Sequence, residues 1–91
     1  MEDTPVKHNI AEGQFEITMA NQTAVLQYRQ SGGTIRLIHT EVPQSLRGRG
    51  LANQLARAAL DYARFHQLKV IPVCPFVKAY MEKHPEAGSF L

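Results

Sequence analysis

The fold of this chain is decided by the stretch Thr40-Glu41-Val42-Pro43-Gln44-Ser45-Leu46-Arg47-Gly48-Arg49-Gly50-Leu51-Ala52. It lies where a predicted extended segment stops and a predicted long helix begins. Helices usually open on a capping Ser, Thr, Asp or Asn, but here Gly50 precedes Leu51. The first N–H groups of the helix are therefore expected to lack a side-chain acceptor. These donors, the positive end of the helix dipole and two guanidinium groups all suit an anion, so we expect the turn to bind a phosphate-bearing ligand.

Length and composition indicate one domain of ordinary globular type. The chain has 91 residues, which we divide into a flexible tail over residues 1–5 and one domain over residues 6–91. A single cysteine excludes an internal disulfide and favours a reducing compartment. The acidic N-terminus does not resemble a signal peptide, and the apolar runs are far shorter than the ~20 residues that span a bilayer. We therefore expect a soluble cytoplasmic protein, monomeric or weakly dimeric, with no membrane contact.

Hydrophobic periodicity predicts an α+β chain in the order β-β-β-β-α-β-α. The expected strands cover residues 6–10, 14–20, 23–30, 34–40 and 69–74, and the expected helices cover residues 51–66 and 75–83. Alternation in the fourth strand puts Ile35, Leu37 and His39 on one face. Leucines and alanines at helical spacing form the face of the long helix that packs on the sheet. The segment 69–74 is almost continuously apolar, which is typical of a strand buried on both faces.

The connection between the fourth and fifth strands predicts where a site lies. A strand, a long helix and a second strand form a crossover, which makes the two strands parallel. Pro72 lacks an N–H, so the fifth strand cannot pair fully and a splay beside it is expected. Ligands of open α/β sheets bind at the C-terminal ends of the strands. The sequence thus predicts a mixed sheet with a splayed parallel pair, at whose edge His39, Glu41, Cys74 and the anion-binding turn meet.

Two common phosphate-binding motifs do not fit the turn. A dinucleotide-binding fingerprint requires a third glycine where Asn53 stands, and an acid about 20 residues further on, where Lys69 and Val70 stand. A P-loop requires Lys and then Ser or Thr after Gly50. Nucleic-acid binding is the weakest interpretation, because no aromatic residues interleave with the basic turn.

What remains is a resemblance to a known family. The turn Arg47-Gly48-Arg49-Gly50-Leu51-Ala52 resembles the acetyl-CoA-binding loop of the GNAT superfamily of N-acetyltransferases. Further segments resemble the short, single-domain YjdJ-type branch of that superfamily, namely Glu41-Val42-Pro43, Ala59-Leu60-Asp61-Tyr62-Ala63, Val70-Ile71-Pro72-Val73-Cys74-Pro75-Phe76-Val77 and His84-Pro85. The resemblance implies a minimal GNAT fold, in which acetyl-CoA enters the splay as cosubstrate.

The resemblance also implies which residues contact acetyl-CoA. The backbone of Val42 would hydrogen-bond the pantetheine arm. The CoA phosphates would lie on the loop, against Leu46, Arg47, Gly48, Arg49, Gly50, Leu51 and Ala52. Two departures from the family pattern are visible. Ser45 stands where Gln or Arg is frequent, which predicts weaker side-chain contact there, and Ala87 stands where an aromatic residue is frequent, which leaves the role of the C-terminal tail open.

Acetylation of an amine needs a base, because a lysine-like amine with a pKa near ~10.4 must lose a proton, and an acid for the departing thiolate. His39 is the first candidate base, or else a strand-end histidine with a structural hydrogen bond. Glu41 is the second candidate, or else a solvated loop acid. Cys74 is expected at the N-cap of the second helix, where it would protonate the thiolate, accept the acetyl group or merely fill space. Tyr80 is a candidate acid, as a tyrosine is in many relatives, or a core aromatic.

Two functions remain in competition. The leading hypothesis is an acetyl-CoA-dependent N-acetyltransferase that transfers acetyl directly to a primary amine of a protein, peptide or small molecule. The alternative is a CoA-binding module with little or no catalysis, because so short a chain lacks the helices that wall the acceptor site in larger relatives. No metal is predicted, since the histidines and the cysteine lack ligand spacing. The identity of the acceptor is left open by the sequence.

Overall fold

The computed structural model describes residues 5–84. Its strands and helices are, in chain order, β1 Lys7–Asn9, β2 Gln14–Met19, β3 Gln22–Ser31, β4 Thr34–Glu41, the 3-10 helix η1 Gln44–Leu46, α1 Leu51–Phe65, β5 Lys69–Pro72 and α2 Pro75–Lys83. This confirms the predicted order of strands and helices. The tail expected over residues 1–5, apart from Pro5, and the segment after His84 lie outside the described residues.

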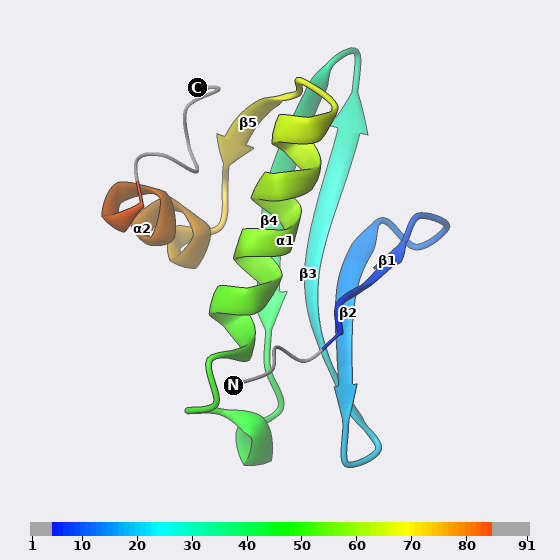
Figure 1. The fold of residues 1–91 in the computed structure, drawn as a ribbon, viewed down its shortest axis with the longest axis vertical. Helices are drawn as coiled ribbons and strands as arrows, with labels where there is room; N and C mark the ends of the chain where they lie inside the picture. Colours follow the sequence, from blue (N-terminus) through cyan, green and yellow to red (C-terminus); the bar gives the residue numbers. More distant parts are fainter. Residues whose placement is uncertain (1–4, 85–91) are drawn as a thin grey trace.

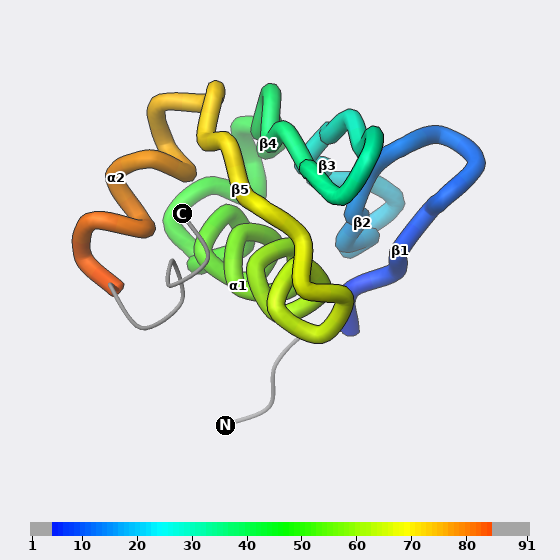
Figure 2. The backbone as a smooth tube through the Cα atoms, turned by 90° about the horizontal axis from the view of Figure 1, so that it is seen from above, coloured from blue at the N-terminus to red at the C-terminus, as the bar shows by residue number. Residues whose placement is uncertain are grey.

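The strands form one sheet in the order β1-β2-β3-β4-β5. Neighbours from β1 to β4 are antiparallel, whereas β4 and β5 are parallel, from Thr34 opposite Lys69 to Leu37 opposite Pro72. The crossover helix α1 lies against one face of the sheet, and α2 lies beside the β5 edge (Figure 1, Figure 2). In Figure 2, no helix within residues 5–84 lies over the other face of β2, β3 and β4, which we call the outer face.

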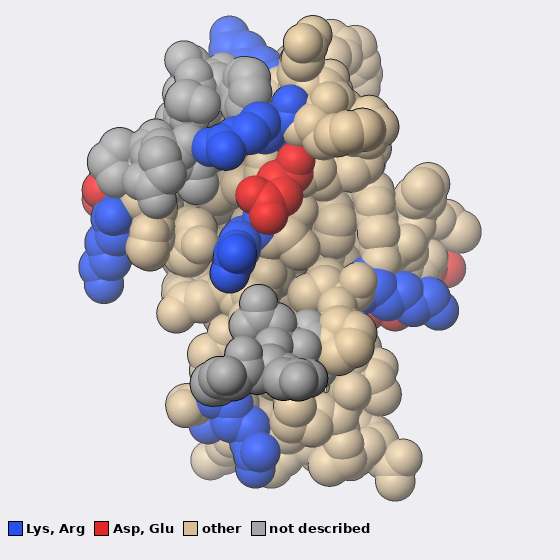
Figure 3. Space-filling model, in the orientation of Figure 1, with Lys and Arg blue, Asp and Glu red and all other residues tan. Residues whose placement is uncertain are grey.

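The core lies between the sheet and α1. Ile17, Leu26 and Leu37 are fully buried there, as the alternating pattern predicts. Ala59 and Ala63 of α1 are also completely buried, because such small side chains let the helix approach the strands closely. The polar side of α1 faces solvent, and Figure 3 shows basic and acidic side chains side by side over this helix.

A β-bulge between β3 and β4 corrects one prediction. Leu37 lies opposite Tyr28, but His39 lies opposite Gln27, so Ile38 is an extra residue in β4. An extra residue reverses the alternation that follows it. His39 therefore points to the outer face with Gln27, and the prediction that it shares a face with Leu37 was wrong. Thr40, opposite the buried Leu26, takes the core side instead.

The fifth strand is shorter and more exposed than predicted. β5 ends at Pro72 rather than at residue 74, and it lies at the edge of the sheet with β4 as its strand neighbour. Because one edge has no partner strand in residues 5–84, Ile71 is half-buried and Val73 is 53% exposed, so burial on both faces was wrong. Pairing stops at Pro72 while β4 continues to Glu41, and this is the splay that the proline predicts.

Candidate active site at the ends of the parallel strands

Helix α1 begins without a side-chain cap. Gly50 occupies the N-cap position with φ +75° and ψ 16°, and no side chain of residues 5–84 caps the helix there. Gly48 also has a left-handed backbone, with φ +83°, and side chains at either glycine would enter open space. The first turn of the helix contains no acid. The uncapped helix start that the sequence predicts is therefore confirmed, and its affinity for an anion stays a prediction.

Hydrogen bonds and a buried leucine hold the glycine turn against the sheet. Leu46 in η1 is 2% exposed and anchors the turn in the core. The Arg47 Nε donates to the Val42 carbonyl oxygen at 3.1 Å, and the Ser45 hydroxyl donates to the Gln22 side-chain oxygen. The Val42 carbonyl is thus already engaged, so a pantetheine hydrogen bond to it would use the second lone pair of the oxygen.

A groove follows the turn toward the end of β4. One open pocket of about 530 Å³ is lined by His39, Thr40, Glu41, Val42, Arg47, Ala52 and Phe76. A smaller pocket of about 160 Å³ beside it is lined by Gly48, Gly50 and Leu51, among others, and shares four residues with the first. We call this continuous depression the junction groove. It joins the uncapped start of α1 to the candidate bases.

His39 and Glu41 form a pair at the far end of the junction groove. The His39 Nε2 lies 3.7 Å from the Glu41 Oε1, and the two side chains are 56% and 72% exposed. This distance gives an attraction whenever the imidazole is protonated. The pair can therefore accept a proton from a group that enters the groove, and both members remain open to solvent.

Cys74 does not line the junction groove itself but contacts Thr40, which does. Its side chain is 5% exposed, and its Sγ lies 3.5 Å from the Oγ1 of Thr40. Burial raises the pKa of the Cys74 thiol, but hydrogen bonds from the Thr40 hydroxyl and from the backbone of Val77 and Phe76 outweigh it, so the net pKa is lowered. The predicted N-cap position of Cys74, before Pro75 at the first position of α2, is confirmed.

The structure does not bring Tyr80 to the lining of the junction groove. Tyr80 is half-buried on α2, with its ring centroid 4.4 Å from that of His84 and 6.5 Å from that of Phe76. Its role as a general acid stays a prediction. Three groove residues, Thr40, Asn53 and Phe76, were not among the predicted site residues. Phe76 follows Pro75 at the predicted helix start and was within reach of sequence reasoning, whereas Thr40 faces Cys74 only because of the bulge.

No group of three or more His, Cys, Asp or Glu side chains within residues 5–84 is arranged to hold a metal ion. No helix among them is both long and apolar enough to cross a membrane.

Comparison with known proteins places the chain in a family. A family model described as GCN5-related N-acetyl-transferase matches residues 14–90. Protein NATD1 of Homo sapiens is 39% identical over 83 residues, which cover 88% of this chain and 74% of that protein. Protein NATD1 of Xenopus tropicalis is 37% identical over 83 residues, covering 88% of this chain and 76% of that protein.

A solved structure shares the fold. The NMR structure of a GCN5-like putative N-acetyltransferase from Staphylococcus aureus superposes with a TM-score of 0.72 at 31% identity, covering 96% of this chain and 86% of that one. The chain therefore belongs to the GCN5-related N-acetyltransferases, the GNAT superfamily that its glycine turn resembles. Within that superfamily it is similar to Protein NATD1 of several vertebrates over most of its length.

Proposed function

We propose that this protein is an acetyl-CoA-dependent N-acetyltransferase that transfers acetyl directly to a primary amine. One observation carries the proposal: the junction groove connects the uncapped start of α1 with the His39–Glu41 pair. A ligand with phosphates at one end and a thioester at the other suits this arrangement. The helix start favours the anionic end, and the strand end offers groups that can move a proton.

The glycine turn fits the phosphates of CoA. Gly48 and Gly50 place no side chain of their own at the helix start, and the first turn of α1 carries no acid that would repel an anion. In the proposal, the phosphates lie on residues 46–52 and the pantetheine arm passes the backbone of Val42. Arg47 and Arg49 supply positive charge beside the phosphates.

The proposed reaction moves protons at His39. His39 accepts a proton from the acceptor ammonium, and the Glu41 Oε1 lies 3.7 Å from its Nε2. The neutral nitrogen then forms a bond to the acetyl carbon, and the carbon–sulfur bond to CoA breaks. The nitrogen loses a further proton as the amide forms, and the CoA thiolate gains one. One proton is released overall for each acetyl group transferred.

Cys74 is proposed to supply the proton that the CoA thiolate takes up. Its thiol lies beside Thr40 at the groove wall, and its lowered pKa makes it a better donor than an ordinary thiol. A second route would attach the acetyl group to the Cys74 Sγ, with the thiol proton passing to CoA, before the amine attacks. The 5% exposure of Cys74 disfavours this route, because the Sγ must first become accessible to the thioester.

The competing function is a CoA-binding module without catalysis. The exposure of His39 and Glu41 favours it, because proton transfer in an open site competes with water. The two functions share the binding step and differ in whether any amine is acetylated.

Mass spectrometry and thermal unfolding separate the two functions. Incubation with acetyl-CoA and a panel of amines should yield an acetylated amine, and His39→Gln should lower the rate by ~10²–10⁴-fold while keeping the thermal upshift with acetyl-CoA. His66→Gln, at the C-terminal cap of α1, is the matched control and should keep the rate. An upshift with no acetylated amine supports the binding module, and no upshift overturns both functions. A transient acetyl group on Cys74 would establish the second route.

A further inference from the structure

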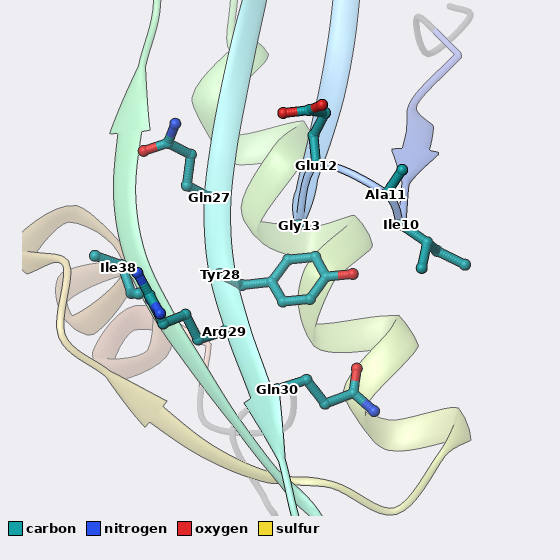
Figure 4. A pocket seen from close by; sticks show the side chains of 9 residues that line it. All are labelled: Ile10, Ala11, Glu12, Gly13, Gln27, Tyr28, Arg29, Gln30 and Ile38. Atoms are coloured by element: carbon teal, nitrogen blue, oxygen red, sulfur yellow. The ribbon is translucent and has the colours of Figure 1, made fainter.

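A separate pocket opens on the outer face of the sheet, beside the bulge (Figure 4). Its volume is about 620 Å³, within the range of small-molecule sites. The loop between β1 and β2 contributes Ile10 and Glu12 to its lining, β3 contributes Gln27 and Arg29, and β4 contributes the bulge residue Ile38. We call it the outer pocket. It shares no lining residue with the junction groove.

An unusual charge pair lies at the outer pocket. Arg29, which lines it, lies directly opposite Arg36 on the neighbouring strand, and both are exposed. Like charges directly opposite each other in an antiparallel pair are destabilising. Within residues 5–84, neither guanidinium has a carboxylate partner at ion-pair distance. An anion bound between them would relieve the repulsion and accept charge-assisted hydrogen bonds.

The outer pocket adjoins the proposed catalytic base. His39 lies opposite Gln27, whose side chain lines the outer pocket, while His39 itself lines the junction groove. Arg29 follows Gln27 by two residues on the same face of β3, a separation of about 6.8 Å along the strand. The pocket and the groove therefore meet at the cross-strand pair of Gln27 and His39. The bulge is the reason, because it turns His39 to the outer face.

The wall opposite Arg29 carries a negative charge. Figure 4 shows the Glu12 side chain reaching from the β1–β2 loop toward β3, whereas the Gln27 and Arg29 side chains extend on the other side of that strand, the side of Ile38. Within the described chain, Glu12 and Arg29 form no ion pair with each other. The outer pocket thus presents a guanidinium and a carboxylate that do not pair with each other, which suits a ligand that carries both charges.

We infer that the outer pocket binds the acceptor, and that the acceptor is a small amine bearing an anionic group, a carboxylate or a phosphate, a few Å from its nitrogen. This rests on the proposed function and names its substrate class. Arg29 and Arg36 hold the anionic group. Glu12 attracts the ammonium, and His39, across Gln27, removes its proton. The thioester reaches the same nitrogen from the junction groove.

The first test compares acceptors that differ only in the anionic group. Acetylation of an amino acid, of its amide and of an aminoalkyl phosphate is measured with the wild type, Arg29→Gln and Arg36→Gln. The ratio of kcat/KM for the charged acceptor to that for the amide should fall about 10- to 100-fold in both variants, as expected for loss of one charge-assisted hydrogen bond. Arg57→Gln is the control, because it removes a charge from an exposed residue of α1, on the opposite face of the sheet from the outer pocket. It should leave the ratio unchanged.

The second test needs no turnover. The same three compounds are titrated into the protein without acetyl-CoA, and the backbone amide resonances of Gln27 and Arg29 are followed by NMR. Suppose that a charged compound binds, that Arg29→Gln weakens this binding, and that the first test yields no acetylated product. This result supports the outer pocket as a binding site and refutes the proposed function. Acetylation with an unchanged kcat/KM ratio in Arg29→Gln retains the function and overturns this inference. Preference for the amino acid or for the phosphate decides which anionic group the pocket takes.

Discussion

Substitutions at Gly50 separate the backbone strain of the helix start from the charge of its ligand. Gly50 has φ +75°, and a side chain there would enter open space. Asn and Asp tolerate the left-handed region better than other residues with side chains, and they are almost equal in size. The pair Gly50→Asn and Gly50→Asp therefore differs essentially in one negative charge at the start of α1.

The expected effects have opposite signs for the free and the bound protein. Both variants lose about 1 kcal/mol to the left-handed backbone, which lowers the Tm of a domain of this size by about 4–8 °C. Asp regains about 0.3–1 kcal/mol from the helix dipole. Against a phosphate about 4 Å away, the same charge costs about 1 kcal/mol in water and about 4 kcal/mol at an effective dielectric constant of 20. Affinity for acetyl-CoA should therefore be ~5- to 1000-fold lower for Asp than for Asn.

Thermal unfolding with and without acetyl-CoA tests this reasoning. Without ligand, Gly50→Asp should unfold at or above the temperature of Gly50→Asn. With ligand the order should reverse, because ligand stabilisation follows RT ln(1 + [L]/Kd). Gly32→Asp, in the β3–β4 turn with φ +55° and open space around it, is the control and should keep the wild-type upshift. Equal upshifts in the two Gly50 variants would refute a phosphate at this helix start.

Three further predictions concern the fold. Burial, and then the charge of His66, lower the pKa of His8, so the unfolded chain binds more protons below about pH 6.5 and the Tm should fall on acidification toward about pH 5. His8→Phe should lose less over that range, and an equal loss contradicts the assignment. Ala59→Leu should lower the free energy of unfolding by ~1–3 kcal/mol, because Ala59 is completely buried; an unchanged urea midpoint contradicts close packing of α1. Gly13→Ala should cost more than Gly32→Ala, since the added carbon meets the Tyr28 carbonyl oxygen at 3.2 Å; equal midpoints contradict this contact.

Local patterns in the sequence predicted most of the architecture. The order of strands and helices, the crossover and the uncapped start of α1 all follow from residues close together in the chain. Alternation identified Ile17, Leu26 and Leu37 as core residues because the period of a strand is two wherever its ladder is regular. The edge position of β5 was missed, because an apolar run does not reveal how many neighbours a strand has.

The candidate site was predicted only in part, because the sequence reveals connectivity but not strand pairing. Connectivity alone brings Glu41, Cys74 and the glycine turn to one end of the parallel strands, and the structure places them there. The direction of His39 and the contact of Thr40 with Cys74 depend on one extra residue in β4. A bulge forms where two strands pair, and a pairing is a property of two distant segments, so neither segment alone indicates it.

By itself, the sequence determined the order of strands and helices, the family and the uncapped turn at Gly50, because each depends on residue types at short spacing. Only the tertiary structure decided that His39 faces the outer side, that Cys74 is buried behind Thr40, and that Arg29 meets Arg36 across two strands. These features arise from strand register, which long-range pairing sets and local propensity does not.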